Sequence, residues 1–233
     1  MTAALMLELR DLSKSFELHH QHGARLNVLR GLDLRLHAGE CVVLSGASGA
    51  GKSTLLRVIY ANYRPSFGAV HVRHDGRWLD LAKASPHEVL DVRRRTLGYV
   101  SQFLRVIPRV PAVDIVAEPV LQTGASPQLA RQRASEMLHR LNVPERLWSL
   151  PPGTFSGGEQ QRVNIARGLI VPRPILLLDE PTASLDANNR AVVAELLTEA
   201  RAAGSAVLGI FHDEDMRDQI ATRLFPMQAL EAA

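Results

Sequence analysis

The stretch GASGAGKS at residues 46–53 decides the fold of this chain. It follows the apolar run CVVL and leads into KSTLLRVIYAN, whose apolar residues recur at helical spacing. Its glycines let successive backbone N–H groups face an anion, Lys52 places a positive charge beside the phosphates, and the Ser53 hydroxyl is suited to ligate Mg²⁺. The dipole of the following helix also favours phosphate at its first turn. The stretch therefore predicts a nucleotide-phosphate site between a strand and a helix.

Strand and helix patterns alternate on both sides of this site. Residues 5–44 hold short alternating or apolar runs, which predict an antiparallel β layer that leads into a buried strand. Further strands are predicted at 97–101, 175–178 and 206–211, and helices at 158–169, 187–203 and 214–221. This alternation indicates a parallel sheet covered on both faces. Residues 104–150, with the helical segment 128–141 and several prolines, predict a helical lobe inserted in that core.

Composition restricts the class of protein and its compartment. The 233 residues suffice for one substantial domain, and the single cysteine, Cys41, allows no disulfide within the chain, which suits a reducing cytosol. The apolar runs fall short of the roughly 18 residues that a membrane helix needs. The net charge of +3 is small, and the basic residues are scattered. We expect a cytoplasmic protein without direct nucleic-acid binding and without membrane insertion.

Two further motifs carry chemistry. In ILLLDEP at residues 175–181, Asp179 and Glu180 come at the carboxyl end of a buried strand, where such sheets bind ligands. Asp179 is placed to hold Mg²⁺ through its hydration shell, and Glu180 to orient or deprotonate the attacking water. In FSGGEQQR at residues 155–162, small residues at a helix start leave backbone N–H groups free for a second anion site. Two anion sites for one triphosphate make sense if the second serves a neighbouring subunit.

These motifs, with SQ at 101–102, ASLD at 183–186 and FHD at 211–213, resemble the nucleotide-binding domain of the ABC ATPase family over nearly the whole chain. The resemblance implies an α/β P-loop NTPase fold of ABC type, with an N-terminal antiparallel β layer and an inserted helical lobe. It also implies an ATPase that uses ATP and Mg²⁺. We predict a single ABC ATPase domain over 1–233, with the β layer and core in 1–103 and 151–233 and the lobe in 104–150. In that family two domains pair head to tail, and each ATP is closed between one phosphate loop and the opposite signature.

The same resemblance implies roles for single residues. Gln102 senses Mg²⁺ and the γ-phosphate, His212 contacts the γ-phosphate, and Asp186 couples the two sites of the dimer. Phe16 corresponds to the aromatic residue that stacks on adenine, which is usually Tyr in the family. The predicted catalytic residues are Glu180, His212 and Gln102, and the predicted metal ligands are Ser53, Gln102 and Asp179. The predicted nucleotide contacts are Phe16, Gly46, Ala47, Ser48, Gly49, Ala50, Gly51, Lys52, Ser53, Thr54, Ser156, Gly157, Gly158, Glu159 and Asp186.

Longer strings, among them YANYRPSFG at 60–68 and LNVPERLW at 141–148, resemble the ABC-type subunits of the bacterial carbon–phosphorus lyase system, which degrades phosphonates. That resemblance implies a non-transporting subunit that supports conversion of phosphonate and ATP to ribose 1-phosphonate 5-triphosphate. Its partners would be the lyase core subunits and a second ABC protein, in a homodimer or heterodimer.

Two alternatives stay open. One is the ATPase subunit of a membrane transporter of the lipoprotein-release or macrolide-efflux class, whose membrane partner would bind the apolar segment FLRVIPRVP at 103–111. The other is a non-hydrolysing interaction subunit, which the complete pair of Asp179 and Glu180 argues against.

Three other features favour structural roles. HHQH at residues 19–22 offers no further ligand at metal-binding spacing and is interpreted as a solvated turn. The three arginines at 93–95 are interpreted as a solvated helix end. Trp78 and Trp148 are expected to be packing residues.

Overall fold

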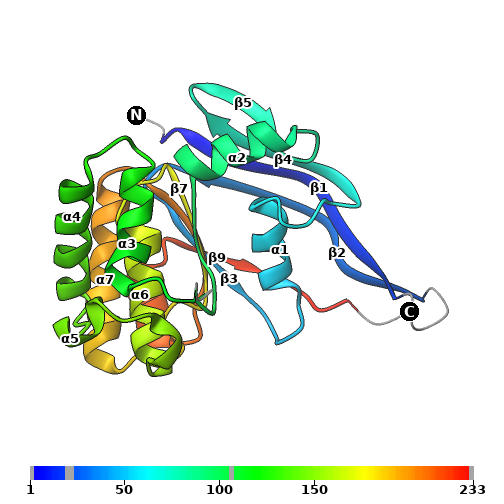
Figure 1. The fold of residues 1–233 in the computed structure, drawn as a ribbon. Helices are drawn as coiled ribbons and strands as arrows, with labels where there is room; N and C mark the ends of the chain where they lie inside the picture. The colour runs from blue at the N-terminus through cyan, green and yellow to red at the C-terminus, as the bar shows by residue number, and fades with distance from the viewer. Residues whose placement is uncertain (1–2, 19–23, 105–107, 231–233) are drawn as a thin grey trace.

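The computed structural model describes residues 3–18, 24–104 and 108–230. Its strands form a four-stranded antiparallel sheet in the order β2-β1-β4-β5 and a five-stranded parallel sheet in the order β6-β7-β8-β3-β9 (Figure 1). The strands are β1 (Leu5–Leu18), β2 (Ala24–His37), β3 (Cys41–Ser45), β4 (Phe67–His74), β5 (Arg77–Asp80), β6 (Leu97–Val100), β7 (Ile175–Asp179), β8 (Ala206–Ile210) and β9 (Arg223–Pro226).

The helices divide between the two faces of the parallel sheet. Helix α1 contacts β2, β7 and β8, whereas α3 to α7 stand together on the other side of the parallel sheet (Figure 1). The helices are α1 (Lys52–Ile59), α2 (Pro86–Arg95), α3 (Ala112–Leu121), α4 (Pro127–Arg140), α5 (Glu145–Trp148), α6 (Gly157–Leu169), α7 (Ala187–Ala202) and α8 (Glu214–Ile220), with a 3-10 turn η1 (Pro152–Thr154) before α6.

The parallel strands have two buried faces, and β3 shows why. Cys41 and Val43 face the core formed with helices α3 to α8, and Val42 and Leu44 face the core formed with α1 and the antiparallel sheet. Because successive side chains of a strand point to opposite faces, a continuous apolar run is what such a strand requires. Cys41 is fully buried, and burial raises the pKa of its thiol to about 12. The predicted α/β core and antiparallel layer are confirmed.

Sequence reasoning missed four elements, namely β4, β5, α2 and β9. Helix α2 carries a readable start signal, because Ser85 caps it and Glu88 completes a capping box, with Pro86 in the first turn. The histidines at 19–22 lie outside the described residues, as do residues 105–107 of the apolar segment 103–111. Within the described ranges, no helix combines the length and apolar character that crossing a bilayer requires.

Two of the structural interpretations need correction. Trp78 is 41% exposed, so it is not a packing residue of the core. The Arg73 guanidinium lies over its ring, 5.7 Å from the ring centroid. Arg93 is not merely solvated, because its guanidinium donates to the Tyr60 carbonyl at 3.0 Å and lies over the Tyr60 ring. The prediction for Trp148 is confirmed, since its indole packs against the helical core and donates to the Val143 carbonyl.

Candidate functional site

The loop between β3 and α1 is shaped to receive an anion. Gly51 caps α1 with a φ of 85° and without a side-chain cap, which leaves the first amides of the helix open. Gly46 has a φ of 137°, and a Cβ there would lie 2.2 Å from the Met227 carbonyl oxygen, so no larger residue fits. The Lys52 ammonium donates to the carbonyls of Gly46 and Ala47 at 2.7 and 2.9 Å, which holds its charge over the loop. Backbone amides and one ammonium therefore converge where a phosphate would bind.

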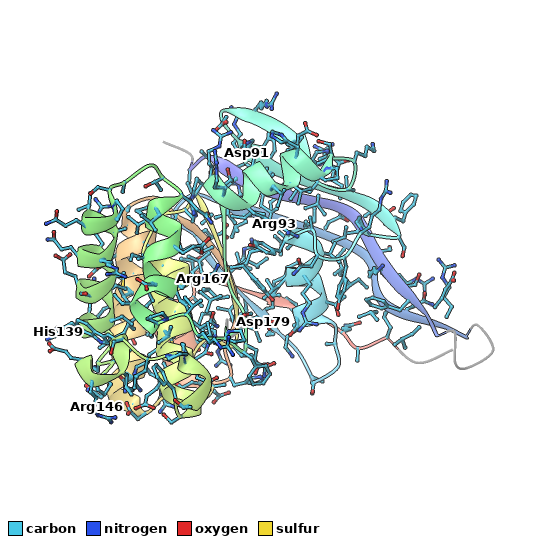
Figure 2. All side chains as sticks on the ribbon, in the orientation of Figure 1. Asp91, Arg93, His139, Arg146, Arg167 and Asp179 are labelled. Atoms are coloured by element: carbon cyan, nitrogen blue, oxygen red, sulfur yellow. The ribbon has the colours of Figure 1, made fainter. Side chains whose placement is uncertain are left out.

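Asp179 ends β7 and is 1% exposed. Its Oδ1 accepts a hydrogen bond from the Ser53 hydroxyl at 2.8 Å, and its Oδ2 accepts one from the Tyr99 hydroxyl at 3.1 Å. Burial, and then the charge of Asp179, raises the pKa of Tyr99, so this phenol stays protonated and donates. In Figure 2 Asp179 lies between helices α3 to α7 on one side and helix α1 on the other. A hydroxyl and a carboxylate, both suited to Mg²⁺, thus meet beside the phosphate loop.

Glu180 lies directly after Asp179, with both carboxylate oxygens engaged. Gln102 donates its Nε2–H to Oε2 at 3.0 Å, and His212 Nε2 lies 2.7 Å from Oε1. The φ of Glu180 is 51°, in the left-handed region that a non-glycine residue adopts only when its surroundings enforce it. The three residues predicted to be catalytic therefore meet at one point, although each follows a different strand.

The predicted second anion site lies at the start of α6. The Ser156 hydroxyl accepts from the Glu159 amide at 3.3 Å, and the Glu159 carboxylate accepts from the Ser156 amide at 2.8 Å. This capping box satisfies those two amides, whereas Gly157 and Gly158, at the first two helical positions, have no partner within the helix. A Cβ at Gly157 would meet no atom within 4 Å, so the helix start is open. Helix α6 and helix α1 pack on opposite faces of the parallel sheet.

Sequence reasoning missed three residues that tie these parts together. Gln161 of α6 donates to the Pro181 carbonyl at 2.9 Å, and Asn164 of α6 donates to the Ser101 carbonyl at 2.6 Å. Both amides are buried, and they connect α6 to the segments that carry Glu180 and Gln102. Polar residues on the buried side of a helical pattern are the signal that would have revealed them. Tyr99, the third, is indistinguishable in the sequence from an ordinary strand residue.

Asp186 and Phe16, predicted from the resemblance alone, have local partners in the structure. Asp186 caps α7, and its pKa is lowered chiefly by the hydrogen bond from the Asn189 amide. Phe16, near the end of β1, meets Tyr63 edge-to-face with ring centroids 5.3 Å apart. The Lys14 ammonium lies 4.7 Å from the centroid of the Phe16 ring. Neither contact tests the predicted roles, which stay predictions.

Comparison with known proteins identifies the family. Residues 29–183 match the family described as ABC transporter. The lipoprotein-releasing system ATP-binding protein LolD of Hyphomonas neptunium is 37% identical over 209 residues, which cover 89% of this chain and 88% of LolD. The macrolide export ATP-binding/permease protein MacB of Bordetella avium is 38% identical over 89% of this chain. This chain spans only 30–32% of the length of the similar MacB and PvdT proteins.

Solved structures agree with this family. A dimeric structure of MJ0796, described as a bacterial ABC transporter cassette, matches with a TM-score of 0.87 and 28% identity. A second dimeric structure of MJ0796, described as a post-hydrolysis state bound to ADP and Pi, matches with a TM-score of 0.86 and 29% identity. Each match covers 96% of this chain and 95% of the other.

These relatives overturn the assignment to the carbon–phosphorus lyase system. The similar proteins are named as ATP-binding proteins of lipoprotein release, macrolide export and pyoverdine export. The resemblance of strings such as YANYRPSFG and LNVPERLW therefore does not identify the task of this ATPase. The prediction of lyase core subunits as partners is wrong for the same reason. The chain belongs to the ABC transporter family and has the ATP-hydrolysing P-loop cassette of that family.

Proposed function

We propose that this cassette binds Mg²⁺-ATP through the loop at 46–53. The glycine backbone and Lys52 bind the β- and γ-phosphates, and Ser53 and Asp179 hold the magnesium ion, with Gln102 beside it. The observation in support is the convergence of the Ser53 hydroxyl, the buried Asp179 carboxylate and the Lys52 ammonium at one end of α1. Magnesium supplies charge neutralisation at the phosphates when it is bound. The other nucleotide contacts predicted above, Phe16 and Thr54 among them, are part of this proposal.

Glu180 orients the attacking water and accepts its proton. General-base catalysis of this kind contributes about 10²–10⁴ in rate. The contacts to Gln102 and His212 fix the direction of the carboxylate, and each oxygen keeps a second lone pair that can accept a hydrogen bond from the water. Gln102 and His212 are therefore placed to respond to the γ-phosphate while they hold the base.

We infer that the active form is a head-to-tail pair of cassettes. Residues 1–233 act as one ATPase unit, with 104–150 as its helical lobe. The open start of α6, at Ser156 to Glu159, faces the phosphate loop of a partner cassette, and Asp186 lies at the junction. The support is the exposed Gly157 and the dimeric MJ0796 structures, which match this chain over 96% of its length.

We infer that the task of the cassette is to drive a membrane transporter of the lipoprotein-release or export class. The similarity to LolD, which covers nearly all of both chains, carries this inference. A groove of about 540 Å³ lies between α2, β6, α3 and α6, with Glu118 and Arg167 among its lining residues. Leu90, which lines this groove, is 62% exposed. Phe103, which follows β6 and does not line the groove itself, is 75% exposed. This surface suits a cytosolic segment of a permease.

Affinity purification tests the transporter assignment. Tagged Glu180→Gln protein is purified with ATP and Mg²⁺ from detergent-solubilised membranes of the native host, and its partners are identified by mass spectrometry. We expect a polytopic membrane protein. The matched control combines Glu180→Gln with Leu90→Ser, which changes an exposed side chain of the groove on α2, away from the ATP site, and should reduce that recovery. Recovery of only water-soluble partners, with or without detergent, would contradict the assignment.

A further inference from the structure

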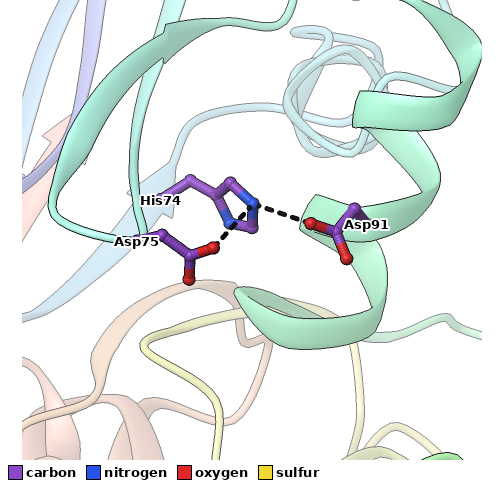
Figure 3. Close-up of side chains that lie close together, drawn as sticks. All are labelled: His74, Asp75 and Asp91. Atoms are coloured by element: carbon purple, nitrogen blue, oxygen red, sulfur yellow. Dashed lines mark hydrogen bonds and ion pairs between the residues drawn. The ribbon is translucent and has the colours of Figure 1, made fainter.

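A second cluster of metal-binding side chains lies away from the ATP site. His74 ends β4, Asp75 follows it in the turn to β5, and Asp91 lies on α2 (Figure 3). The imidazole of His74 is buried, with 2% of the residue exposed. Its Nε2 lies 3.1 Å from Oδ2 of Asp91 and 3.6 Å from Oδ2 of Asp75. One ring nitrogen therefore faces two carboxylates that belong to different elements.

The other ring nitrogen is already held. Nδ1 of His74 lies 2.7 Å from the Thr96 hydroxyl oxygen, and both residues are buried. Without a metal, a proton on Nε2 donates to Asp91 and the Thr96 hydroxyl donates to Nδ1. Metal binding requires the other tautomer, in which a proton on Nδ1 donates to the Thr96 oxygen and the lone pair of Nε2 binds the metal. Metal-binding histidines are oriented in this way by an outer partner on the second nitrogen.

The two distances from the His74 nitrogen to the carboxylates are close to those between ligands in tetrahedral coordination. Two ligand atoms, each about 2.0–2.1 Å from a tetrahedral Zn²⁺, lie roughly 3.3–3.4 Å from one another. The two distances from the His74 nitrogen fall on either side of this value, and all three donor atoms lie within 4.8 Å of one another. The tight Asp75–Gly76 turn, with φ values of 47° and 76°, sets the position of the first carboxylate. Helix α2 sets the position of the second.

A cation already interacts with both carboxylates. The Arg95 guanidinium lies 2.7 Å from Asp75 Oδ2 and also bonds Asp91. Its Nη2 is 3.3 Å from Nε2 of His74, so it lies beside the position that a metal would take. The Arg95 side chain is 45% exposed and is able to turn into solvent without opening the core. Two carboxylates attract a compact divalent ion more strongly than a single delocalised positive charge.

We propose that His74, Asp75 and Asp91 bind a divalent transition metal of the zinc type, in competition with the guanidinium of Arg95. The metal links the β4–β5 hairpin to α2 and leaves a fourth coordination position for water. Helix α2 also supplies Leu90 and Arg93 to the groove described above, so the metal holds one wall of that groove in place. The proposal is independent of the ATP site and of the transporter assignment.

Calorimetric titration of Zn²⁺ into the metal-stripped full chain, at neutral pH and without nucleotide, tests the proposal. Arg95→Gln removes the competing cation, and we expect it to tighten zinc binding by about tenfold or more. Arg94→Gln is the matched control, because Arg94 is 4.0 Å from Asp91 and does not bridge the two carboxylates. Arg94→Gln should tighten binding less than Arg95→Gln.

The ligands are tested in the Arg95→Gln chain. Adding His74→Gln should abolish the tight site, and adding the exposed-turn change Asp75→Asn should weaken it without a risk to the core. Co²⁺ should give the visible absorption of a tetrahedral site with Arg95→Gln alone, and lose it with either ligand change. If Arg95→Gln binds zinc no more tightly than Arg94→Gln, or if its binding survives both ligand changes, the cluster is an ion-pair network only and the proposal is wrong.

Discussion

The imidazole of His212 is bonded to the carboxylate of Glu180, with Nε2 2.7 Å from Oε1. Gln102 engages the other oxygen at 3.0 Å, so the carboxylate is held from two sides. These contacts join three loops that follow β6, β7 and β8, and they orient Glu180 next to the buried Asp179. The pair of His212 and Glu180 is therefore the point at which the predicted catalytic residues depend on one another.

Glu180→Gln should lower the rate of ATP hydrolysis by about 10²–10⁴, because the amide cannot accept a proton from water. ATP binding should persist, since the phosphate loop and Asp179 are unchanged. Single-turnover hydrolysis and nucleotide titration measure the two effects separately. Glu180→Asp keeps a carboxylate and serves as the control, with a smaller loss. Full turnover by Glu180→Gln would show that Glu180 is not the base.

Ser156→Asp should block ATP-dependent dimerisation while the fold is preserved. Aspartate caps a helix about as well as serine, so α6 stays intact, but its charge repels the triphosphate of the partner. ATP binding by the monomer should match the unmodified chain. Size-exclusion chromatography in the Glu180→Gln background, with and without ATP, reads out the dimer. Ser156→Thr, which caps the helix without a charge, is the control. A normal ATP-dependent dimer with Ser156→Asp would refute the partner-facing role of this helix start.

Tyr99→Phe should raise the Mg²⁺ concentration needed for half-maximal ATPase activity by about 2–10-fold, because one hydrogen bond to Asp179 is lost. The ring remains to stack on Tyr60, whose centroid is 4.8 Å away. Activity at saturating Mg²⁺ should change less than the half-saturation point. Tyr63→Phe is the control, since that hydroxyl lies 3.4 Å from Arg57 and not at Asp179. Equal Mg²⁺ dependence in all three chains would exclude a positioning role for Tyr99.

Asp91→Asn should lower the melting temperature at neutral pH. The hydrogen bond from Arg95, together with one from His74, lowers the pKa of Asp91 from 3.8 to about 2. A carboxyl group with a lowered pKa stabilises the fold above its unfolded pKa, and this stabilisation is lost as the pH falls towards about 2. The difference in melting temperature between the two chains should therefore shrink from pH 4 downwards. Glu195→Gln, which changes an exposed carboxylate on α7, should show no such pH-dependent gap.

The sequence predicts strands β1 and β2 of the antiparallel layer, the phosphate loop and the parallel strands β3, β6, β7 and β8, because each rests on a local pattern. CVVL before the glycine loop, and the helical spacing after it, need no distant information. Hairpin β4–β5 and helix α2 were missed because their apolar signal is weak: α2 buries only Val92. The task of the ATPase was predicted wrongly, because the motifs at 46–53 and 175–181 determine the hydrolysis chemistry and carry no information about the process that it drives.

The sequence by itself determined the ATP chemistry, since the loop at 46–53 and the carboxylates after β7 are short, contiguous motifs whose spacing the backbone imposes. Only the tertiary structure decided which distant side chains meet. Ser53 and Asp179 are 126 positions apart, and His74 and Asp91 are 17 apart on different elements. Such contacts arise when strands and helices pack around a common core, and no local period in the sequence records them.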